Sequence, residues 1–596
     1  MQTPSSHEAS FSNRVKWFYN AFKKWQVITL LLAAQIVYCS EESFFKLAPI
    51  VMTGSGAVLG KVITVGNRSI DTFLGIPYAR PPVGELRFRK PERVTPWNGT
   101  YQATAETPAC WQTTLRFIEG APLNYSTSAS EDCLYLNIWK RSSICPASTT
   151  CSDKRPVVVF IHGGAFQWGD SALFVYDPAN FVALSDVVFV TFNYRVSIFG
   201  FLSLGKPEVP RNFGLWDQHL VLSWVRENIA SFGGDPDEVT LIGQSAGAIS
   251  VGLQAASPKR QGLFKRAILM SSTPLSIILG FSHRGVGKFI HVAGALGCYN
   301  SRKSVEVQLD SIMTCLRKLE PWFIIRTIET LDPNSQVFAP EYGDEFFPEH
   351  PLAAKTWTKL PFKQVILGTT ADEGTILLDN IQYSSPALKK LLATEYRLAM
   401  TVAMQPLFGI SISRARPIVE AYFGGPDVQH RSESIVRIAS ELLGDGVFYC
   451  PVKLIADAAA RQGIDTYRYL FAHRASHSLW PKWMGVSHGD DTLYLLGSLP
   501  FMKDKSRYTK VLGDVGRKRL QQLDYTPKEE NFMHQIVAAI NSFVTTGKPQ
   551  LPVCGKEWPR YTTTNPAVIQ LRPGNISEVK EKKYKCELWR EYLLMK

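Results

Sequence analysis

Short apolar runs alternate with segments of helical periodicity along most of the chain. The continuous Val-, Ile- and Phe-rich runs are residues 156–161 (PVVVFI), 187–194 (VVFVTFNY), 239–242 (VTLI), 365–367 (VIL) and 466–471 (TYRYLF). Residues 218–229 and 246–256 have the spacing of apolar positions that is typical of helices. Continuous apolar strands between helices indicate a mostly parallel sheet that is buried on both faces. The pattern therefore predicts an α/β fold.

The chain after its first 39 residues has the organisation of a single domain. At about 150 residues per domain, a chain of 596 residues would suggest about four domains. However, no internal repeat and no long Pro/Gly/Ser linker divides it. We therefore predict one domain over residues 40–596. We expect the helical and loop-rich stretch of about residues 273–360 to fold over the sheet edge and to shape a pocket.

Residues 1–39 have the pattern of a secretory signal. The segment begins with a basic region formed by Arg14, Lys16, Lys23 and Lys24. The apolar stretch that follows, residues 27–38, is shorter than the roughly 20 residues that a membrane-spanning helix needs. This favours a cleaved signal peptide over the alternative, an uncleaved signal anchor. We expect a secreted protein with no stable membrane span.

Composition narrows the function classes. Hydrophobic residues make up 45% and charged residues 20% of the chain, which is ordinary for globular proteins and excludes a disordered chain, a fibre and a polytopic membrane protein. The net charge is +13. Because the sequence has no dense Lys/Arg run and no nucleic-acid-binding motif, this charge indicates a basic solvated surface and no nucleic-acid partner.

The ten cysteines and four glycosylation triplets fit an oxidising compartment. No two cysteines form a C-x-x-C pair, and their spacing with histidines indicates no zinc site, so we expect no metal. Several cysteines should form disulfides outside the cytosol. The Asn-x-Ser/Thr triplets are candidate glycan sites at Asn67, Asn98, Asn124 and Asn575.

The motif at residues 243–247, Gly-Gln-Ser-Ala-Gly, predicts a nucleophilic serine at Ser245. It follows the strand at 239–242 and opens the helix at 246–256, which is the context that a G-x-S-x-G motif requires. A sharp strand-to-helix turn exposes the hydroxyl, and flanking glycines let strand and helix pack closely. The helix N-terminus favours negative charge that develops on a substrate. The alternative is a Gly-rich turn with a passive serine.

A second Gly-rich loop is a candidate oxyanion site. His162-Gly163-Gly164-Ala165-Phe166 follows directly after the strand at 156–161. Backbone N–H groups in this loop, together with that of Ala246, can point at a developing oxyanion. The small residues would let a substrate carbonyl approach closely. The alternative is a loop that merely turns tightly.

The residues alone leave the base and the acid open. In this type of fold the acid and then the histidine follow the serine along the chain. Among the eight histidines after Ser245, His473 ends a predicted strand and His488 lies in a Gly-flanked loop. Asp372 and Glu373 both end a strand segment. Because adjacent residues on an extended segment point to opposite sides, only one of these carboxylates should orient an imidazole.

Eight ordered segments resemble the type-B carboxylesterase/cholinesterase family of α/β-hydrolases, over nearly all of the chain after the signal. They are FLGIPYARPPVGELRF (73–88), SEDCLYLNIW (130–139), IHGGAF (161–166), the segment 212–248 that contains the serine motif, GDEFFPEHP (343–351), ADEG (371–374), FAHRAS (471–476) and GVSHGDD (485–491). The resemblance implies an α/β-hydrolase fold with helical insertions over the active site.

The same resemblance implies roles for individual residues. It implies a catalytic triad of Ser245, Glu373 and His488, and it makes His473 a non-catalytic family histidine. The implied oxyanion loop is Gly163, Gly164 and Ala165, completed by Ala246, with Ala165 at a position where the family has Gly. The implied disulfides are Cys110–Cys133, Cys298–Cys315 and Cys450–Cys586. Cys145 and Cys151 flank a five-residue loop and could pair, which leaves Cys554 as a free thiol.

Two departures from cholinesterases argue against choline esters. Cholinesterases hold quaternary ammonium by cation–π contact with a Trp about ten residues before the second Cys of the first disulfide loop, where this chain has Leu123-Asn124-Tyr125. Gln244 stands where cholinesterases have Glu. Other features, GQSAG and the G-x-x-H-x-x-D pattern of 485–491 among them, are similar to the juvenile hormone esterase motif set.

The sequence therefore predicts a secreted serine carboxylesterase that hydrolyses small or apolar uncharged esters through an acyl-enzyme. One alternative is a methyl ester hydrolase similar to juvenile hormone esterase. Another is a catalytically weak relative that acts in adhesion, binding or scavenging of esters and organophosphates. The implied chemistry needs no metal or organic cofactor, and its partner is a small-molecule ester.

Overall fold

The computed structural model describes residues 48–118, 121–123, 129–142, 154–203, 211–279, 284–331, 338–357, 359–424, 432–478, 480–504, 518, 524–551, 557–580 and 585–594. The predicted signal, Asn124, Cys145, Cys151 and Cys554 lie outside these residues. The chain divides into two compact units, residues 1–49 and 50–596. All helices and strands named below belong to the second unit.

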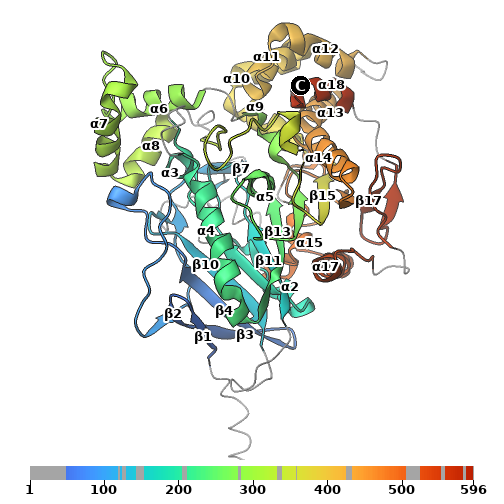
Figure 1. The fold of residues 1–596 in the computed structure, drawn as a ribbon. Helices are drawn as coiled ribbons and strands as arrows, with labels where there is room; N and C mark the ends of the chain where they lie inside the picture. Colours follow the sequence, from blue (N-terminus) through green and yellow to red (C-terminus); the bar gives the residue numbers. More distant parts are fainter. Residues whose placement is uncertain are drawn as a thin grey trace, which may run out of the picture. The chain divides into compact units, whose positions relative to one another are not determined.

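Eleven of the strands in the described part of the chain form one central sheet (Figure 1). Its order is β18 (Ser577–Val579), β17 (Val568–Leu571), β16 (Asp465–Phe471), β15 (Gln364–Thr370), β14 (Arg266–Met270), β13 (Gly234–Gln244), β11 (Arg155–Ile161), β12 (Val188–Phe192), β10 (Tyr135–Arg141), β4 (Arg68–Pro77) and β3 (Lys61–Val65). The strands from β17 to β12 run parallel. Antiparallel pairs complete both edges.

Helices cover both faces of this sheet, and the strands are apolar for that reason. In β11, Val157, Val159 and Ile161 enter one hydrophobic core, whereas Val158 and Phe160 enter the other. This alternation follows from the two-residue repeat of a strand. The first core also contains α4 (Phe213–Asn228), α5 (Ala246–Ala256) and α14 (Cys450–Arg461), and the second contains α2 (Ala179–Leu184) and α17 (Pro527–Thr546). The prediction of an α/β fold with a mostly parallel sheet is confirmed.

The helix expected at 218–229 begins earlier than its polar–apolar pattern indicates. Helix α4 starts at Phe213, directly after Asn212, whose φ of 57° is left-handed. The Asn212 amide donates to the Glu341 carbonyl (2.7 Å) and to the Asp344 carboxylate (2.9 Å). These tertiary contacts hold the start of the helix. By contrast, α5 has the bounds that the sequence predicts, 246–256.

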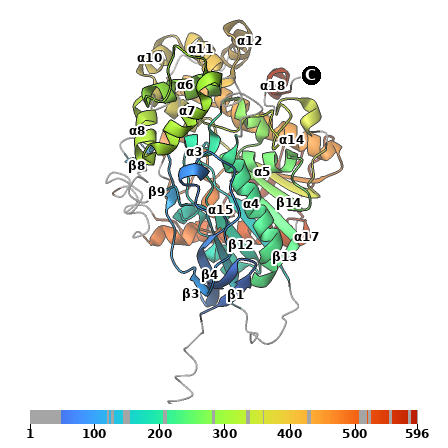
Figure 2. The same cartoon turned by 60° about the vertical axis from the view of Figure 1, so that its left-hand side comes forward.

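Two groups of helices follow the carboxyl ends of β14 and β15. The first is α6 (Arg284–Ala295), α7 (Val305–Lys318) and α8 (Pro321–Leu331), within the stretch expected to be helical. The second is α9 (Thr375–Ser384), α10 (Pro386–Thr394), α11 (Tyr396–Phe408), α12 (Ile412–Phe423) and α13 (Ser432–Gly444), which the sequence analysis did not predict. Figures 1 and 2 show both groups at the same end of the sheet.

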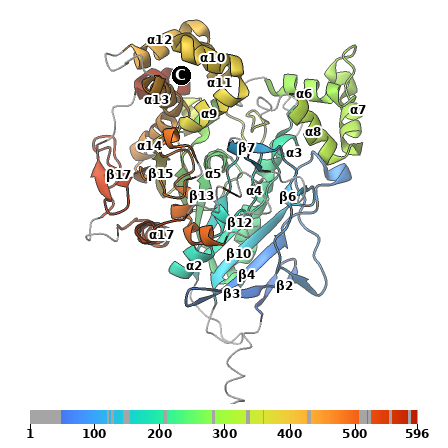
Figure 3. The same ribbon diagram turned by 180° about the vertical axis from the view of Figure 1, so that it is seen from behind.

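Disulfides join the three cysteine pairs that the family resemblance implies: Cys110–Cys133, Cys298–Cys315 and Cys450–Cys586. The last of these ties the start of α14 to α18 (Cys586–Leu593). Figure 3 shows the C-terminal end of the chain beside α13. Within the described ranges, none of the helices has both the length and the apolar character to cross a membrane. The side chains of Asn67, Asn98 and Asn575 are exposed, as a glycan site requires.

Candidate active site

Ser245 lies at the turn between β13 and α5, in a backbone conformation that non-glycine residues rarely adopt. Its φ is 56° and its ψ is −124°. Such strain persists only where surrounding contacts determine it. The Ser245 N–H donates to the Met270 carbonyl on the neighbouring strand (2.9 Å), and its own carbonyl accepts from the Ile249 N–H (3.0 Å). The turn is therefore held from the sheet side and from the helix side.

The two glycines of the motif are required by close packing around this turn. A Cβ at Gly247 would lie 2.0 Å from the carbonyl oxygen of Ile161 on β11. A Cβ at Gly243 would lie 2.3 Å from the backbone of Gly247. Because both obstacles are backbone atoms, no rotamer change would relieve them. The helix can reach its position against the sheet only with glycine at these two positions.

Of the two adjacent carboxylates after β15, Glu373 is the one that faces a histidine. His488 Nδ1 lies 2.6 Å from Glu373 Oε2, and both side chains are largely buried. The second oxygen, Glu373 Oε1, accepts from the Thr370 N–H (2.7 Å). Asp372 turns the other way, and its Oδ2 accepts from the Val486 N–H (2.9 Å). Only one of the two carboxylates thus faces an imidazole, as predicted, but the physical reason differs, because β15 ends at Thr370 and both residues lie in the turn that follows it.

His473, the other histidine that the residues left open, belongs to a separate cluster. Its Nε2 lies 2.8 Å from Glu529 Oε1, at the start of α17. Glu529 also accepts from the Ser476 N–H (2.8 Å) and from the Thr526 N–H (2.8 Å), which caps the helix. Burial opposes ionisation of Glu529, but these hydrogen bonds outweigh it and hold its pKa well below the usual range. The contacts of His473 are those of a structural residue.

The free nitrogen of His488 meets the side chain of Gln244. Gln244 Nε2 lies 3.3 Å from His488 Nε2. With the Nδ1 proton donated to Glu373, His488 Nε2 carries the lone pair and accepts from the amide. Ser245 and His488 both lie in the described part of the chain, and there no hydrogen bond joins His488 Nε2 to the Ser245 hydroxyl. Sequence reasoning had no signal for this contact, because the two residues are 244 positions apart.

The oxyanion loop packs directly on the serine turn. Gly164, Ala165 and Phe166 have φ values of 115°, 52° and 63°. A Cβ at Gly164 would lie 1.9 Å from the Trp168 carbonyl oxygen, and a Cβ at Gly163 would lie 3.1 Å from Ser245 Cβ. Ala165 tolerates its left-handed conformation at a cost of roughly 1–2 kcal/mol. The loop thus adopts a left-handed conformation at Ala165 although this residue is not glycine.

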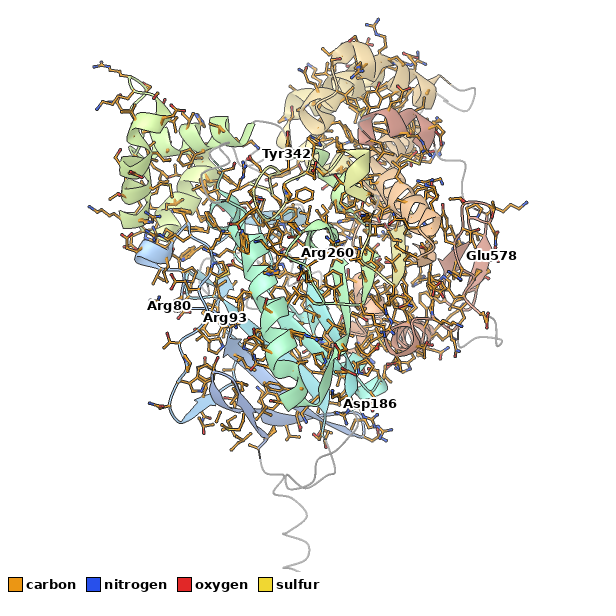
Figure 4. All side chains as sticks on the ribbon, viewed as in Figure 1. Arg80, Arg93, Asp186, Arg260, Tyr342 and Glu578 are labelled. Carbon is orange, nitrogen blue, oxygen red and sulfur yellow. A yellow bond between two sulfur atoms is a disulfide. The ribbon has the colours of Figure 1, made fainter. Side chains whose placement is uncertain are left out.

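The side chain of Gln167 ties the oxyanion loop to the segment that starts at Phe338. Its amide donates to the carbonyls of Ala165 (3.2 Å) and Phe338 (2.5 Å). The Phe338 N–H in turn donates to Gln167 Oε1 (3.2 Å). Tyr342, labelled in Figure 4, marks the same segment. This side chain therefore couples the loop to a second wall of the site.

Burial shifts the pKa values of three ionisable groups next to the site toward the neutral form. Burial raises the pKa of Asp490 to about 8 and that of Asp491 to about 7. Asp491 Oδ2 also accepts from the Tyr469 hydroxyl (2.7 Å). Burial lowers the pKa of His162, which precedes the oxyanion loop, to about 4.

The described residues contain no group of three or more His, Cys, Asp or Glu side chains that could hold a metal ion. What the site brings together is a strained serine, a histidine bonded to a buried carboxylate, and a loop with backbone N–H groups. A hydroxyl, a base and an electrostatic cradle are the parts that nucleophilic acyl transfer needs.

Comparisons with known proteins point to the same chemistry. The sequence profile described as "Carboxylesterase family" matches residues 47–589. Acetylcholinesterase of Bungarus fasciatus is 34% identical over 560 residues, which cover 91% of this chain and 86% of that protein. Acetylcholinesterase of Leptinotarsa decemlineata is 32% identical, with 93% and 87% covered. Acetylcholinesterase-1 of Trittame loki is 31% identical, with 95% and 98% covered.

Proposed function

This chain belongs to the carboxylesterase family, and we propose that it is a secreted serine esterase that hydrolyses small or apolar uncharged carboxylic esters. The observation that carries the proposal is the hydrogen bond of 2.6 Å between Glu373 and His488, next to the strained turn at Ser245. This contact supports the acid–base half of the triad that the family resemblance implies. Family membership supports ester hydrolysis, and the residues of the site support the mechanism.

The proposed reaction has two half-steps. The Ser245 hydroxyl attacks the ester carbonyl while His488 Nε2 takes its proton, and Glu373 stabilises the imidazolium that forms. The N–H groups of Gly164, Ala165 and Ala246 hold the oxyanion. The alcohol leaves with the proton from His488. Water, activated by the same nitrogen, then attacks the acyl-enzyme, releases the acid and returns the proton to the serine.

The Gln244 amide must release His488 before the first step. It occupies the same lone pair that accepts the serine proton, at 3.3 Å. Catalytic hydrogen bonds are often loose without substrate and tighten when the substrate binds. The contact also favours a second candidate function, in which the site reacts with esters or organophosphates but turns over slowly and acts in binding or scavenging.

The preference for uncharged esters rests on charge at position 244. The relatives named above are acetylcholinesterases, whose substrate is cationic. A carboxylate about 5 Å from a bound ammonium would contribute about 3 kcal/mol at an effective dielectric constant of about 20. Gln244 cannot supply this attraction. A methyl ester hydrolase similar to juvenile hormone esterase is one specific form of the proposed activity.

Hydrolysis of a short aryl ester by the secreted protein, with Ser245→Ala in parallel, tests the activity. We expect turnover that disappears in the variant. A folded wild type that takes up one equivalent of organophosphate without turnover would support the scavenging function instead. Comparison of acetylthiocholine with its neutral isostere, 3,3-dimethylbutyl thioacetate, tests the substrate class. A kcat/KM at least tenfold higher for the cation would refute the preference for uncharged esters.

Secretion rests on separate observations. The N-terminal pattern, the three disulfides and the exposed side chains of Asn67, Asn98 and Asn575 all fit an oxidising, glycosylating route. Expression in a secreting cell line, followed by N-terminal sequencing of the medium protein and glycosidase treatment, tests this route. We expect cleavage near Cys39 and a loss of mass with the glycosidase. Retention of the protein in the membrane fraction would favour a signal anchor.

A further inference from the structure

A turn of π-helix interrupts the helical segment between α13 and α14. It comprises residues Asp445–Tyr449 (η6), and all five of its residues are buried. A π-helical turn adds a residue to a helix and is frequently found at functional sites. One extra residue rotates the side chains of the turn relative to those of a regular α-helix. The extra residue therefore decides which side chains of this turn point toward the proposed triad.

The inner side of this turn contacts the histidine of the proposed triad. The ring of Phe448 lies on the imidazole of His488, with centroids 4.5 Å apart and planes inclined by 35°. Phe448 is only 5% exposed, so its ring has little room to move. The residue had no distinguishing signal in the sequence, since an apolar residue in a helical pattern indicates only a core position.

The end of the preceding helix packs against the turn that carries the acid of the proposed triad. A Cβ at Gly374, the residue after Glu373, would lie 1.9 Å from the Ser440 carbonyl oxygen and 2.5 Å from the Gly444 nitrogen. The backbone of α13 therefore lies directly against the turn that carries the carboxylate. One continuous helical segment thus contacts His488 and the turn that carries Glu373.

The outer side of the turn is held by the last helix of the chain. A Cβ at Gly446 would lie 2.5 Å from the indole ring of Trp589 on α18, which is fully buried. The Trp589 Nε1–H donates to the Tyr422 hydroxyl (3.0 Å), and that hydroxyl donates to Asp445 Oδ2 (2.5 Å). The disulfide Cys450–Cys586 joins α18 to α14, the helix that follows the π-helical turn.

We propose that Phe448 is a positioning residue for His488, and that α18, through Trp589, holds the π-helical turn that places it. The inference rests on the proposed function. The bond to Glu373 fixes one nitrogen of the imidazole, and once the Gln244 amide has released the other nitrogen, this single hydrogen bond leaves the ring free to tilt. The flat face of Phe448 limits that tilt. Productive catalytic geometry demands orientation within about 10–20°.

Phe448→Leu tests the first part, because leucine keeps an apolar side chain but removes the flat face. The matched control is Phe423→Leu on α12, since Phe423 is also buried and its ring lies 5.1 Å from that of Tyr396, inclined by 40°, outside the proposed triad. Each variant is assayed with an aryl ester, and the rate is divided by the number of sites that an organophosphate titrates. This division removes losses that are due to misfolding alone.

We expect Phe448→Leu to lower kcat per titrated site about tenfold with KM within twofold, because displacements of the order of 1 Å cost up to about 100-fold. We expect Phe423→Leu to lower the melting temperature by about as much as Phe448→Leu does, but to leave kcat per titrated site unchanged. A higher KM with unchanged kcat would make Phe448 a pocket wall and overturn the inference. Equal kcat losses in both variants would overturn it as well.

Trp589→Phe tests the second part, since it removes both the edge of the indole that lies against Gly446 and the donor to Tyr422. We expect kcat per site to fall about threefold, and an unchanged kcat would overturn the role of α18. If the wild type neither turns over nor titrates, the proposed function fails. The positioning role is then read from the rate at which diethyl pyrocarbonate modifies His488, which Phe448→Leu should raise and Phe423→Leu should not. Equal rates would refute it.

Discussion

Replacement of Glu373 by Gln tests the proposed acid with a minimal change of shape. Glu373 Oε2 lies 2.6 Å from His488 Nδ1, and the Glu373 side chain is 4% exposed. The amide removes the negative charge and presents either a neutral oxygen or an N–H to the imidazole. If the N–H faces Nδ1, the histidine is forced into the tautomer that has no lone pair at Nε2.

The magnitude follows from the charge that develops on the histidine. In the transition state the imidazolium faces the carboxylate with charge centres about 4 Å apart, which is worth about 4 kcal/mol at an effective dielectric constant of about 20. A loss of about 4 kcal/mol corresponds to a fall in kcat of about 1,000-fold. The ground state has a neutral imidazole, so we expect KM to change little.

Asp372→Asn is the matched control, because it makes the same chemical change one residue away. Asp372 is exposed, and its Oδ2 accepts from the Val486 N–H rather than from a histidine. We expect kcat within about threefold of the wild type and a loss of unfolding free energy of about 1 kcal/mol. Both variants are measured with an aryl ester under saturating conditions, with circular dichroism as the test of folding.

Two results would refute the reasoning. One is a folded Glu373→Gln variant that keeps more than a tenth of the wild-type kcat. The other is an Asp372→Asn variant that loses as much activity as Glu373→Gln. Either would mean that the hydrogen bond at His488 does not supply the electrostatic stabilisation assigned to it.

Three further predictions concern groups around the proposed triad. Gln244→Leu removes the amide that competes with Ser245, and we expect kcat/KM for an aryl ester to rise by about two- to tenfold, the equivalent of one neutral hydrogen bond; a fall would show that the amide assists. The pKa of Asp491 is raised by burial from 3.8 to about 7, so the folded state binds this proton more tightly than the unfolded state and the wild type loses stability as pH rises through this range. In urea titrations at pH 5 and 8, Asp491→Asn should lose less stability between the two pH values than the wild type. An equal loss in both proteins would contradict a raised pKa of Asp491. Removal of Cys450–Cys586, which closes 136 residues, should cost about 5 kcal/mol by the chain-entropy relation, measured with the paired serine variant; no change in the urea midpoint would contradict this.

The pattern of apolar and polar residues predicted those strands and helices whose own sequence repeat is enough to identify them. The apolar run at 239–242 and the helix at 246–256 mark β13 and α5, because a buried strand and a helix each impose their own repeat on the sequence. The five helices from α9 to α13 were not anticipated. These helices pack against one another, and α11 also contacts α18 through the rings of Phe408 and Trp589.

Unlike the strands and helices, the acid and the histidine of the site could not be chosen from local patterns. Asp372 and Glu373 are chemically equivalent in the sequence, as are His473 and His488. The family resemblance pointed to Glu373 and His488 before the structure did. The structure separates the pairs because the chain folds Glu373 onto His488 and places Glu529 on His473. A carboxylate pairs with the histidine that packing brings within hydrogen-bond distance.

The sequence by itself determined the α/β architecture, the turn at Ser245 and the Gly-rich loop, since each depends on residues that are close along the chain. The tertiary structure decided which partners meet across long separations: Gln244 with His488, Phe448 with His488, and Trp589 with the turn that carries Phe448. Backbone turns follow from local sterics, whereas contacts between distant side chains follow from how whole layers pack.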